Sequence, residues 1–222
     1  MAVKKAAPKK APSKKDELLS ALIHGLSPIP YWIGYKHERF PTRDLPELAI
    51  GAEFRETLSA ALDRTHRARC EYSYRNLGLT AADLGQKKGK KKKGRPDQAD
   101  LVVMLRVERA ERPVAAIEIK RSNTINGGGL TDLRYLKKVR LRSNGGIRAF
   151  LILVTEGGKP KDVVNANGTA NREVVLKKFN GELKVRRVLR AVGHATKPAG
   201  HLPDRVSKEP KAQHWAVLIE VK

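Results

Sequence analysis

Three apolar runs limit what this chain can fold into. Two of them, 101–107 and 114–120, are separated by the short polar stretch 108–113, and the third covers residues 147–155. Each run has the length and the branched side chains of a buried β-strand. The first two predict a hairpin, and the third predicts the most apolar strand of the chain. The centre of the fold should therefore be a β-sheet.

Helical patterns stand on both sides of these strands. Apolar residues recur at helical spacing from Ile50 to Thr65 and again from Leu130 to Leu141. In residues 70–75, Cys and Tyr side chains alternate with the polar side chains of Glu71, Ser73 and Arg75. This period of two predicts one more strand. The resulting order is helix, strand, strand, strand, helix, strand. This order indicates an α/β fold with a mixed sheet.

The flanking regions give weaker signals. Residues 16–25 predict a short helix, and residues 27–46, rich in Pro and aromatic side chains, predict an ordered loop. Residues 172–192 mix helical and strand patterns, and residues 215–221 predict a final strand. We therefore expect one domain over residues 16–222.

Positive charge is the second strong feature of the chain. The formal net charge is +23 over 222 residues. Residues 1–15 predict a disordered basic arm, and residues 86–95 predict a basic loop within the domain. These two segments hold 13 positive and no negative charges, and the rest of the chain is still basic. Such a charge favours a polyanionic partner, most simply nucleic acid.

Other function classes lack their usual signals. Cys70 is the only cysteine, so neither a disulfide within the chain nor a cysteine zinc site is expected. The six histidines form no i, i+4 metal pair, and no Gly-rich phosphate loop stands before a helix. No apolar run approaches the roughly 20 residues that span a bilayer. We expect a cytoplasmic protein without a membrane partner.

Charged residues mark one end of the predicted hairpin. Asp100 heads its first strand, and Glu118 and Lys120 close its second strand. Side chains two residues apart on a strand project from the same face, so Glu118 and Lys120 should lie side by side. Two carboxylates and an ammonium in this arrangement can hold a divalent cation and an attacking water. The pattern therefore indicates hydrolysis of a phosphodiester bond.

The segment Pro96-Asp97 followed by Glu118-Ile119-Lys120 resembles the PD-(D/E)XK nuclease superfamily, which includes many restriction endonucleases and Holliday junction resolvases. The resemblance covers about residues 50–155. It implies a restriction-endonuclease-like αβββαβ core, with a central mixed sheet flanked by helices. It also implies a Mg²⁺-dependent endonuclease of DNA, able to use Mn²⁺, in restriction, defence or recombination. Cutting both strands of a duplex needs two sites, so a homodimer is expected.

The resemblance also implies roles for single residues. Asp100 and Glu118 would bind Mg²⁺, and the backbone carbonyl of Ile119 would be the third ligand. Lys120 would orient the water and stabilise negative charge. Asp97 is the alternative first acid, and we favour Asp100 because it directly precedes the apolar run.

Many members of the superfamily place a further glutamate on the first helix, near the metal. Glu53 is the best match to that position, and Glu56 is the alternative. Either residue also suits an ordinary acidic side chain near a helix N-terminus. A second Glu-x-Lys triplet, Glu220-Val221-Lys222, follows no acid-headed strand and precedes no helix, so we expect an ordinary strand end there.

Basic residues near the motif are the expected contacts with nucleic acid. The basic loop leads into the Asp100 strand, and one face of the helix at 130–142 carries Lys and Arg. The expected contacts are Lys90, Lys91, Lys92, Lys93, Arg95, Arg134, Lys137 and Lys138. Two alternatives stay open: a non-catalytic DNA-binding module on the same fold, and an RNA nuclease.

Overall fold

The structure is a computed structural model of the whole chain. It describes residues 14–39, 46–86, 97–122, 124–125, 129–156, 158–171, 174, 176, 178–192 and 213–222. Most of the predicted basic arm and of the predicted basic loop lies outside these residues. Lys14 and Lys15, which we assigned to the arm, begin the first helix instead.

Six strands form one mixed sheet in the order β1-β2-β3-β4-β6-β5. The strands are β1 (His66–Ser73), β2 (Gln98–Val107), β3 (Ala110–Arg121), β4 (Arg148–Glu156), β5 (Leu183–Val192) and β6 (Gln213–Val221). Neighbouring strands are antiparallel except β3 and β4, which are parallel. The helix α4 (Gly129–Arg142) connects these two, as a parallel pair requires a crossover.

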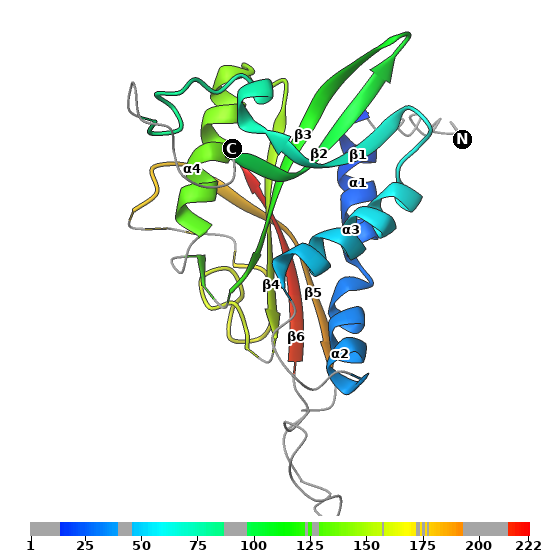
Figure 1. Cartoon of the computed structure of the whole chain (residues 1–222). Helices are drawn as coiled ribbons and strands as arrows, with labels where there is room; N and C mark the ends of the chain where they lie inside the picture. Colours follow the sequence, from blue (N-terminus) through cyan, green and yellow to red (C-terminus); the bar gives the residue numbers. More distant parts are fainter. Residues whose placement is uncertain are drawn as a thin grey trace, which may run out of the picture.

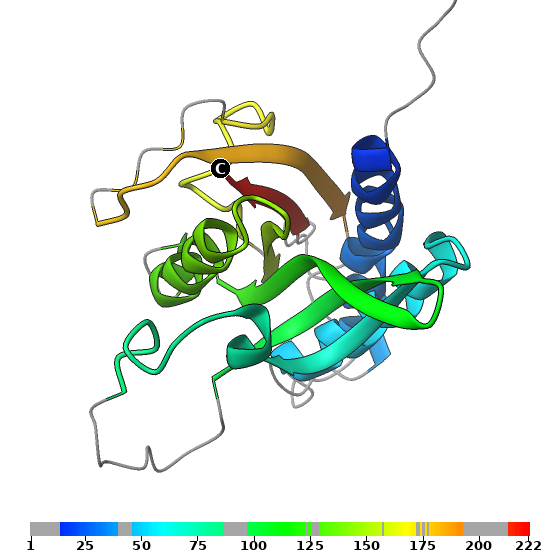
Figure 2. The same ribbon diagram turned by 90° about the horizontal axis from the view of Figure 1, so that it is seen from above.

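Helices cover both faces of the sheet. In Figures 1 and 2, α4 lies on one side, whereas α1 (Lys14–Leu26), α2 (Ile29–Arg39) and α3 (Glu47–Ala61) lie on the other. Among the helices in the described part of the chain, none is long and apolar enough to cross a membrane.

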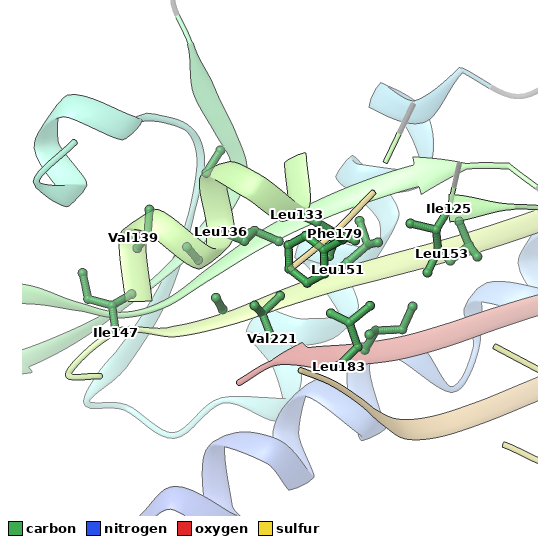
Figure 3. Close-up of a cluster of buried hydrophobic side chains, with 14 of the residues drawn as sticks. Ile125, Leu133, Leu136, Val139, Ile147, Leu151, Leu153, Phe179, Leu183 and Val221 are labelled. Carbon is green, nitrogen blue, oxygen red and sulfur yellow. The ribbon is translucent and has the colours of Figure 1, made fainter. Parts of the chain in front are cut away.

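The hydrophobic core has two layers, one on each face of the sheet. On one face, side chains of α4 such as Leu133 and Leu136 pack on Leu151 of β4, as Figure 3 shows. On the other face, Phe150 and Ile152 of the same strand join the core under α1, α2 and α3. Because β4 is buried on both faces, its sequence is a continuous apolar run instead of an alternating one.

The predicted order of elements around the motif is present. It runs α3, β1, β2, β3, α4, β4, and the sheet is mixed, as expected. The hairpin is longer and its turn is tighter than predicted, since β2 ends at Val107 and β3 begins at Ala110. A register shift after Val103 accommodates Pro113 inside β3.

The prediction of a loop at residues 27–46 is wrong, because α2 lies there. The Pro and aromatic residues of this segment favoured a loop. Pro30 falls in the first turn, where the N–H that proline lacks has no partner within a helix. Ile29 and Ile33 are four residues apart and fully buried against the sheet. The apolar packing of this face stabilises the helix.

The helix α3 is held in place by a close contact with α1. A Cβ atom on Gly25 would lie 2.8 Å from the Cα atom of Leu58, so the two helices meet without an intervening side chain. The hydroxyl of Thr57 donates to the carbonyl of Gly25 at 2.6 Å. This packing fixes α3, whose first turn reaches the carboxyl end of β3.

Candidate active site

The strands β2 and β3 separate where the predicted acids lie. Their pairing ends at Leu101 and Ile117, whereas β2 continues along β1 and β3 continues along β4. The N–H of Ile119 donates to the Asp100 carboxylate, with 2.7 Å between Ile119 N and Asp100 Oδ2. The acid thus takes the place of a strand partner at the start of the gap.

A pocket of about 260 Å³ opens at this gap. The structure brings the three predicted residues Asp100, Glu118 and Lys120 together in its wall. Side chains from β1, the 3₁₀ turn Tyr74–Leu77 and α4 complete the lining. The full set is Glu71, Tyr74, Asp97, Gln98, Ala99, Asp100, Glu118, Lys120, Asp132 and Tyr135.

Glu118 is a buried acid. Only 4% of its surface is exposed, and the hydroxyl of Tyr74 donates to its Oε1. Burial raises the pKa of Glu118 well above its usual range, and the nearby carboxylates of Asp100 and Asp132 raise it further. An ionised Glu118 therefore needs a positive partner inside the pocket.

Lys120 is bound by two carboxylates. Its Nζ lies 3.2 Å from Glu47 Oε2 and 3.2 Å from Asp132 Oδ2. Partial burial opposes the charged form, but Asp132 and Glu47 outweigh it and raise the pKa of Lys120 above the usual range of lysine. Lys120 is consequently a cation at neutral pH.

The oxygen donors suit a hard divalent cation. Mg²⁺ is typically bound by one or two carboxylates and keeps several waters, and Asp100 and Glu118 supply two. Within the described residues, no three Asp, Glu, His or Cys side chains form a complete ligand set. Ile119, the predicted third ligand, is not among the residues that line the pocket, and its N–H is bound to Asp100. The two carboxylates fit a partly hydrated Mg²⁺.

Asp97 lies at the edge of the same pocket. Its carboxylate accepts from Gln86 Nε2 at 3.1 Å, and its backbone carbonyl accepts from the N–H of Tyr74 at 3.1 Å. Both contacts tie Asp97 to the segment before β2. Asp100, by contrast, contacts the backbone of the strand that carries Glu118. The geometry therefore favours Asp100 as the first acid.

On α3, the glutamate that contacts the motif is Glu47 instead of the predicted Glu53. None of Glu47, Glu53 and Glu56 is among the residues that line the pocket. Glu47, in the first turn of α3, reaches both Lys120 Nζ and the N–H of Arg121. Residues of an α-helix follow one another at about 100°, so Glu53 and Glu47 project from different sides of α3.

Sequence reasoning also missed Asp132, the acid of α4 that lines the pocket. It is the only acidic residue of that helix, which carries five Lys or Arg side chains. A single acid on a basic helix next to the motif is a usable signal. Sequence alone did not tell us that the first turn of α4 lies over Lys120.

Three basic side chains of α4 donate hydrogen bonds to backbone carbonyls of the protein itself. Lys137 donates to the carbonyl of Asn180, and Lys138 donates to the carbonyl of Asp83. Arg134 is exposed and donates to the carbonyl of Lys178 at 3.2 Å. Contact of these three side chains with nucleic acid stays a prediction. The other expected contacts, at residues 90–93 and 95, lie outside the described residues.

The second Glu-x-Lys triplet has the opposite surroundings. Glu220 is 1% exposed and forms ion pairs with Arg148 at 2.9 Å, with Lys222 at 3.3 Å and with Arg186. Burial opposes its charge, but hydrogen bonds from Arg148 and Arg186 lower the pKa of Glu220 to about 2. Cations of the protein therefore neutralise Glu220, whereas Glu118 faces other acids.

The arrangement of the pocket residues is what identifies this candidate active site. The predicted acids Asp100 and Glu118 come from two strands that separate, and Lys120 comes from the second of them. Comparison with protein-family models, with curated proteins and with solved structures finds no match for this chain.

Proposed function

We propose that this chain is a divalent-cation-dependent nuclease of the PD-(D/E)XK type that hydrolyses DNA. The convergence of Asp100, Glu118 and Lys120 on one pocket, at the point where β2 and β3 separate, carries the proposal. The net charge of +23 supports a polyanionic substrate. The order αβββαβ supports a restriction-endonuclease-like core.

Each side chain of the pocket has a separate task in this proposal. Asp100 and Glu118 would hold Mg²⁺, with the carbonyl of Ile119 as a third ligand. The bound ion would supply an activated water and neutralise charge on the phosphate. Lys120, already protonated, would stabilise the negative charge that develops on the phosphate oxygens. The Tyr74 hydroxyl orients the Glu118 carboxylate.

The direct test is cleavage of nucleic acids of several forms by the purified chain. Supercoiled plasmid, linear duplex, branched DNA and single-stranded RNA would each be incubated with Mg²⁺, Mn²⁺ or EDTA. We expect DNA cleavage with either metal and none with EDTA, and Lys120→Ala should be inactive. DNA binding without cleavage of any form would favour the non-catalytic module, and cleavage of RNA alone would favour the RNA nuclease.

The same cleavage reactions test how many copies of the chain act together. One pocket cuts one strand at a time, so a double-strand break requires two copies or two binding events. We therefore propose a homodimer on DNA, with a role in restriction, defence or recombination. Double-strand breaks whose rate rises with the square of the chain concentration would support it.

The two candidate first acids can be separated by substitution. Asp100→Asn should lower the cleavage rate by about 100-fold, because a displaced or lost ligand weakens cation binding, whereas Asp97→Asn should cost less than about tenfold. Initial rates at saturating DNA over a range of Mg²⁺ concentrations would measure both. A larger loss in Asp97→Asn would move the first ligand to the Pro-Asp of the motif.

Cation binding should depend on pH. The cation needs an ionised Glu118, and the raised pKa of that acid keeps it protonated at acidic pH. The affinity for Mn²⁺ should therefore increase as the pH rises above the usual range of a glutamate, with protons released on binding. Calorimetric titration in buffers of different ionisation enthalpy would measure both quantities. An affinity independent of pH would contradict Glu118 as a ligand.

A further inference from the structure

Asp132 lies opposite the motif strands, on the first turn of α4. Only 17% of its side chain is exposed, and its Oδ2 lies 3.2 Å from Lys120 Nζ. It lines the same pocket as Asp100 and Glu118. An acid so close to two other acids is under repulsion, and the Lys120 ammonium is the positive charge that compensates it.

Glu47 approaches Lys120 from the opposite layer of the fold. Its Oε2 lies 3.2 Å from Lys120 Nζ, while its Oε1 accepts the N–H of Arg121 at 3.1 Å. The backbone contact fixes the Glu47 carboxylate relative to β3. Two carboxylates, one from α3 and one from α4, thus hold one ammonium between them.

We propose that Asp132 is a positioning residue for Lys120. This inference rests on the proposed function and adds a residue that the PD-(D/E)XK motif does not contain. A lysine side chain loses rotamer entropy when it is fixed. Asp132 and Glu47 fix the Lys120 ammonium at the pocket wall before substrate binds, so it meets the phosphate already oriented.

The variant Asp132→Asn tests this role, because it keeps the side-chain shape and removes the charge. We expect the cleavage rate at saturating DNA to fall by about 10–100-fold. The Michaelis constant for DNA should change less than about twofold, since most phosphate contacts rest on Lys and Arg elsewhere. Asp132→Glu should restore part of the rate.

A spectroscopic readout separates positioning from general damage to the fold. The ¹⁵N signal of the Lys120 ammonium, assigned with Lys120→Arg, should be sharp in the wild type because the ion pairs slow proton exchange. It should broaden or shift in Asp132→Asn. The matched control is Glu111→Gln, which removes an ion pair to Arg69 on the far part of the hairpin and should leave rate and signal unchanged.

The outcomes distinguish this inference from the proposed function. If Asp132→Asn cleaves at the wild-type rate, or if its Lys120 signal is unchanged, the positioning role is overturned and the proposed function still stands. A rate loss of the same size in Glu111→Gln would overturn the positioning role too. A wild-type chain that cleaves no nucleic acid under any condition would contradict the proposed function, and the positioning role would fall with it.

Discussion

Glu118→Gln is expected to abolish cleavage and to stabilise the folded protein at the same time. The amide keeps the hydrogen bond from Tyr74 but removes a charge that binds the cation. Cation catalysis supplies several kcal/mol to such reactions, so the rate should fall by at least about 10³-fold. Initial rates with Mg²⁺ on the DNA form that the wild type cuts would measure the loss.

The gain in stability follows from burial. Glu118 is almost inaccessible to water, and Asp100 and Asp132 repel its charge. The folded state therefore holds the Glu118 proton more tightly than the unfolded state does. Wild-type stability should decline as the pH rises from the unfolded pKa, near 4.5, toward the raised folded pKa. The free energy of unfolding of the Gln variant should not show this decline, because its amide does not ionise.

Thermal unfolding without added metal would show the difference. We expect a higher Tm for Glu118→Gln at neutral pH, by about 2–4 °C for each kcal/mol relieved. The two proteins should converge near pH 4, where Glu118 is protonated. Mg²⁺ should raise the Tm of the wild type but not that of the variant. Wild-type cleavage by Glu118→Gln would refute the assignment of this acid.

Glu220→Gln should have the opposite effects. Glu220 is buried among Arg148, Arg186 and Lys222, so removal of its charge leaves three cations without their shared anion. Breaking a buried ion pair by removing one partner costs about 3 kcal/mol or more. Cleavage by the molecules that remain folded should stay near the wild-type rate. Chemical denaturation and rates at low temperature would test the two expectations.

The pH dependence of this loss has a defined direction. Because the folded-state pKa of Glu220 is lowered to about 2, its contribution is complete above the unfolded pKa, near 4.5. It disappears as the pH falls from there to about 2. The difference in unfolding free energy between wild type and variant should therefore shrink in acid. A difference that grows in acid would contradict the ion-pair assignment.

The two glutamates show why the triplet pattern is not sufficient. Both occur as Glu-x-Lys at the end of an apolar strand, and sequence preferred the first because of the acid-headed strand before it. In the sheet, Glu118 pairs with Leu151, whose side chain belongs to the core layer under α4. Glu220 pairs with Phe150, whose side chain belongs to the core layer under α1, α2 and α3. The two glutamates therefore project from opposite faces of the sheet. The two acids consequently face different surroundings, anionic for Glu118 and cationic for Glu220.

Local periodicity was enough to predict most elements of the fold. The strands at 101–107, 114–120 and 147–155 and the helices on either side of them follow from patterns that depend on near neighbours in the chain. The same local order placed Asp100 before one apolar run and Glu118 with Lys120 at the end of another, although β2 itself begins two residues earlier, at Gln98. The α2 helix was missed because the Pro and aromatic residues of 27–46 suggest a loop, whereas burial of Ile29 and Ile33 stabilises a helix.

The surroundings of the site depend on packing between distant segments. Glu47 and Asp132 are 73 and 12 residues from Lys120, on helices that cover opposite faces of the sheet. Nothing local selects Glu47 over Glu53, since both suit the start of a helix. The close approach of α1 and α3 and the crossover through α4 bring these two acids to Lys120. The sequence by itself singled out Asp100, Glu118 and Lys120. Only the tertiary structure decided which charges surround these residues, because electrostatic contacts depend on distance in space.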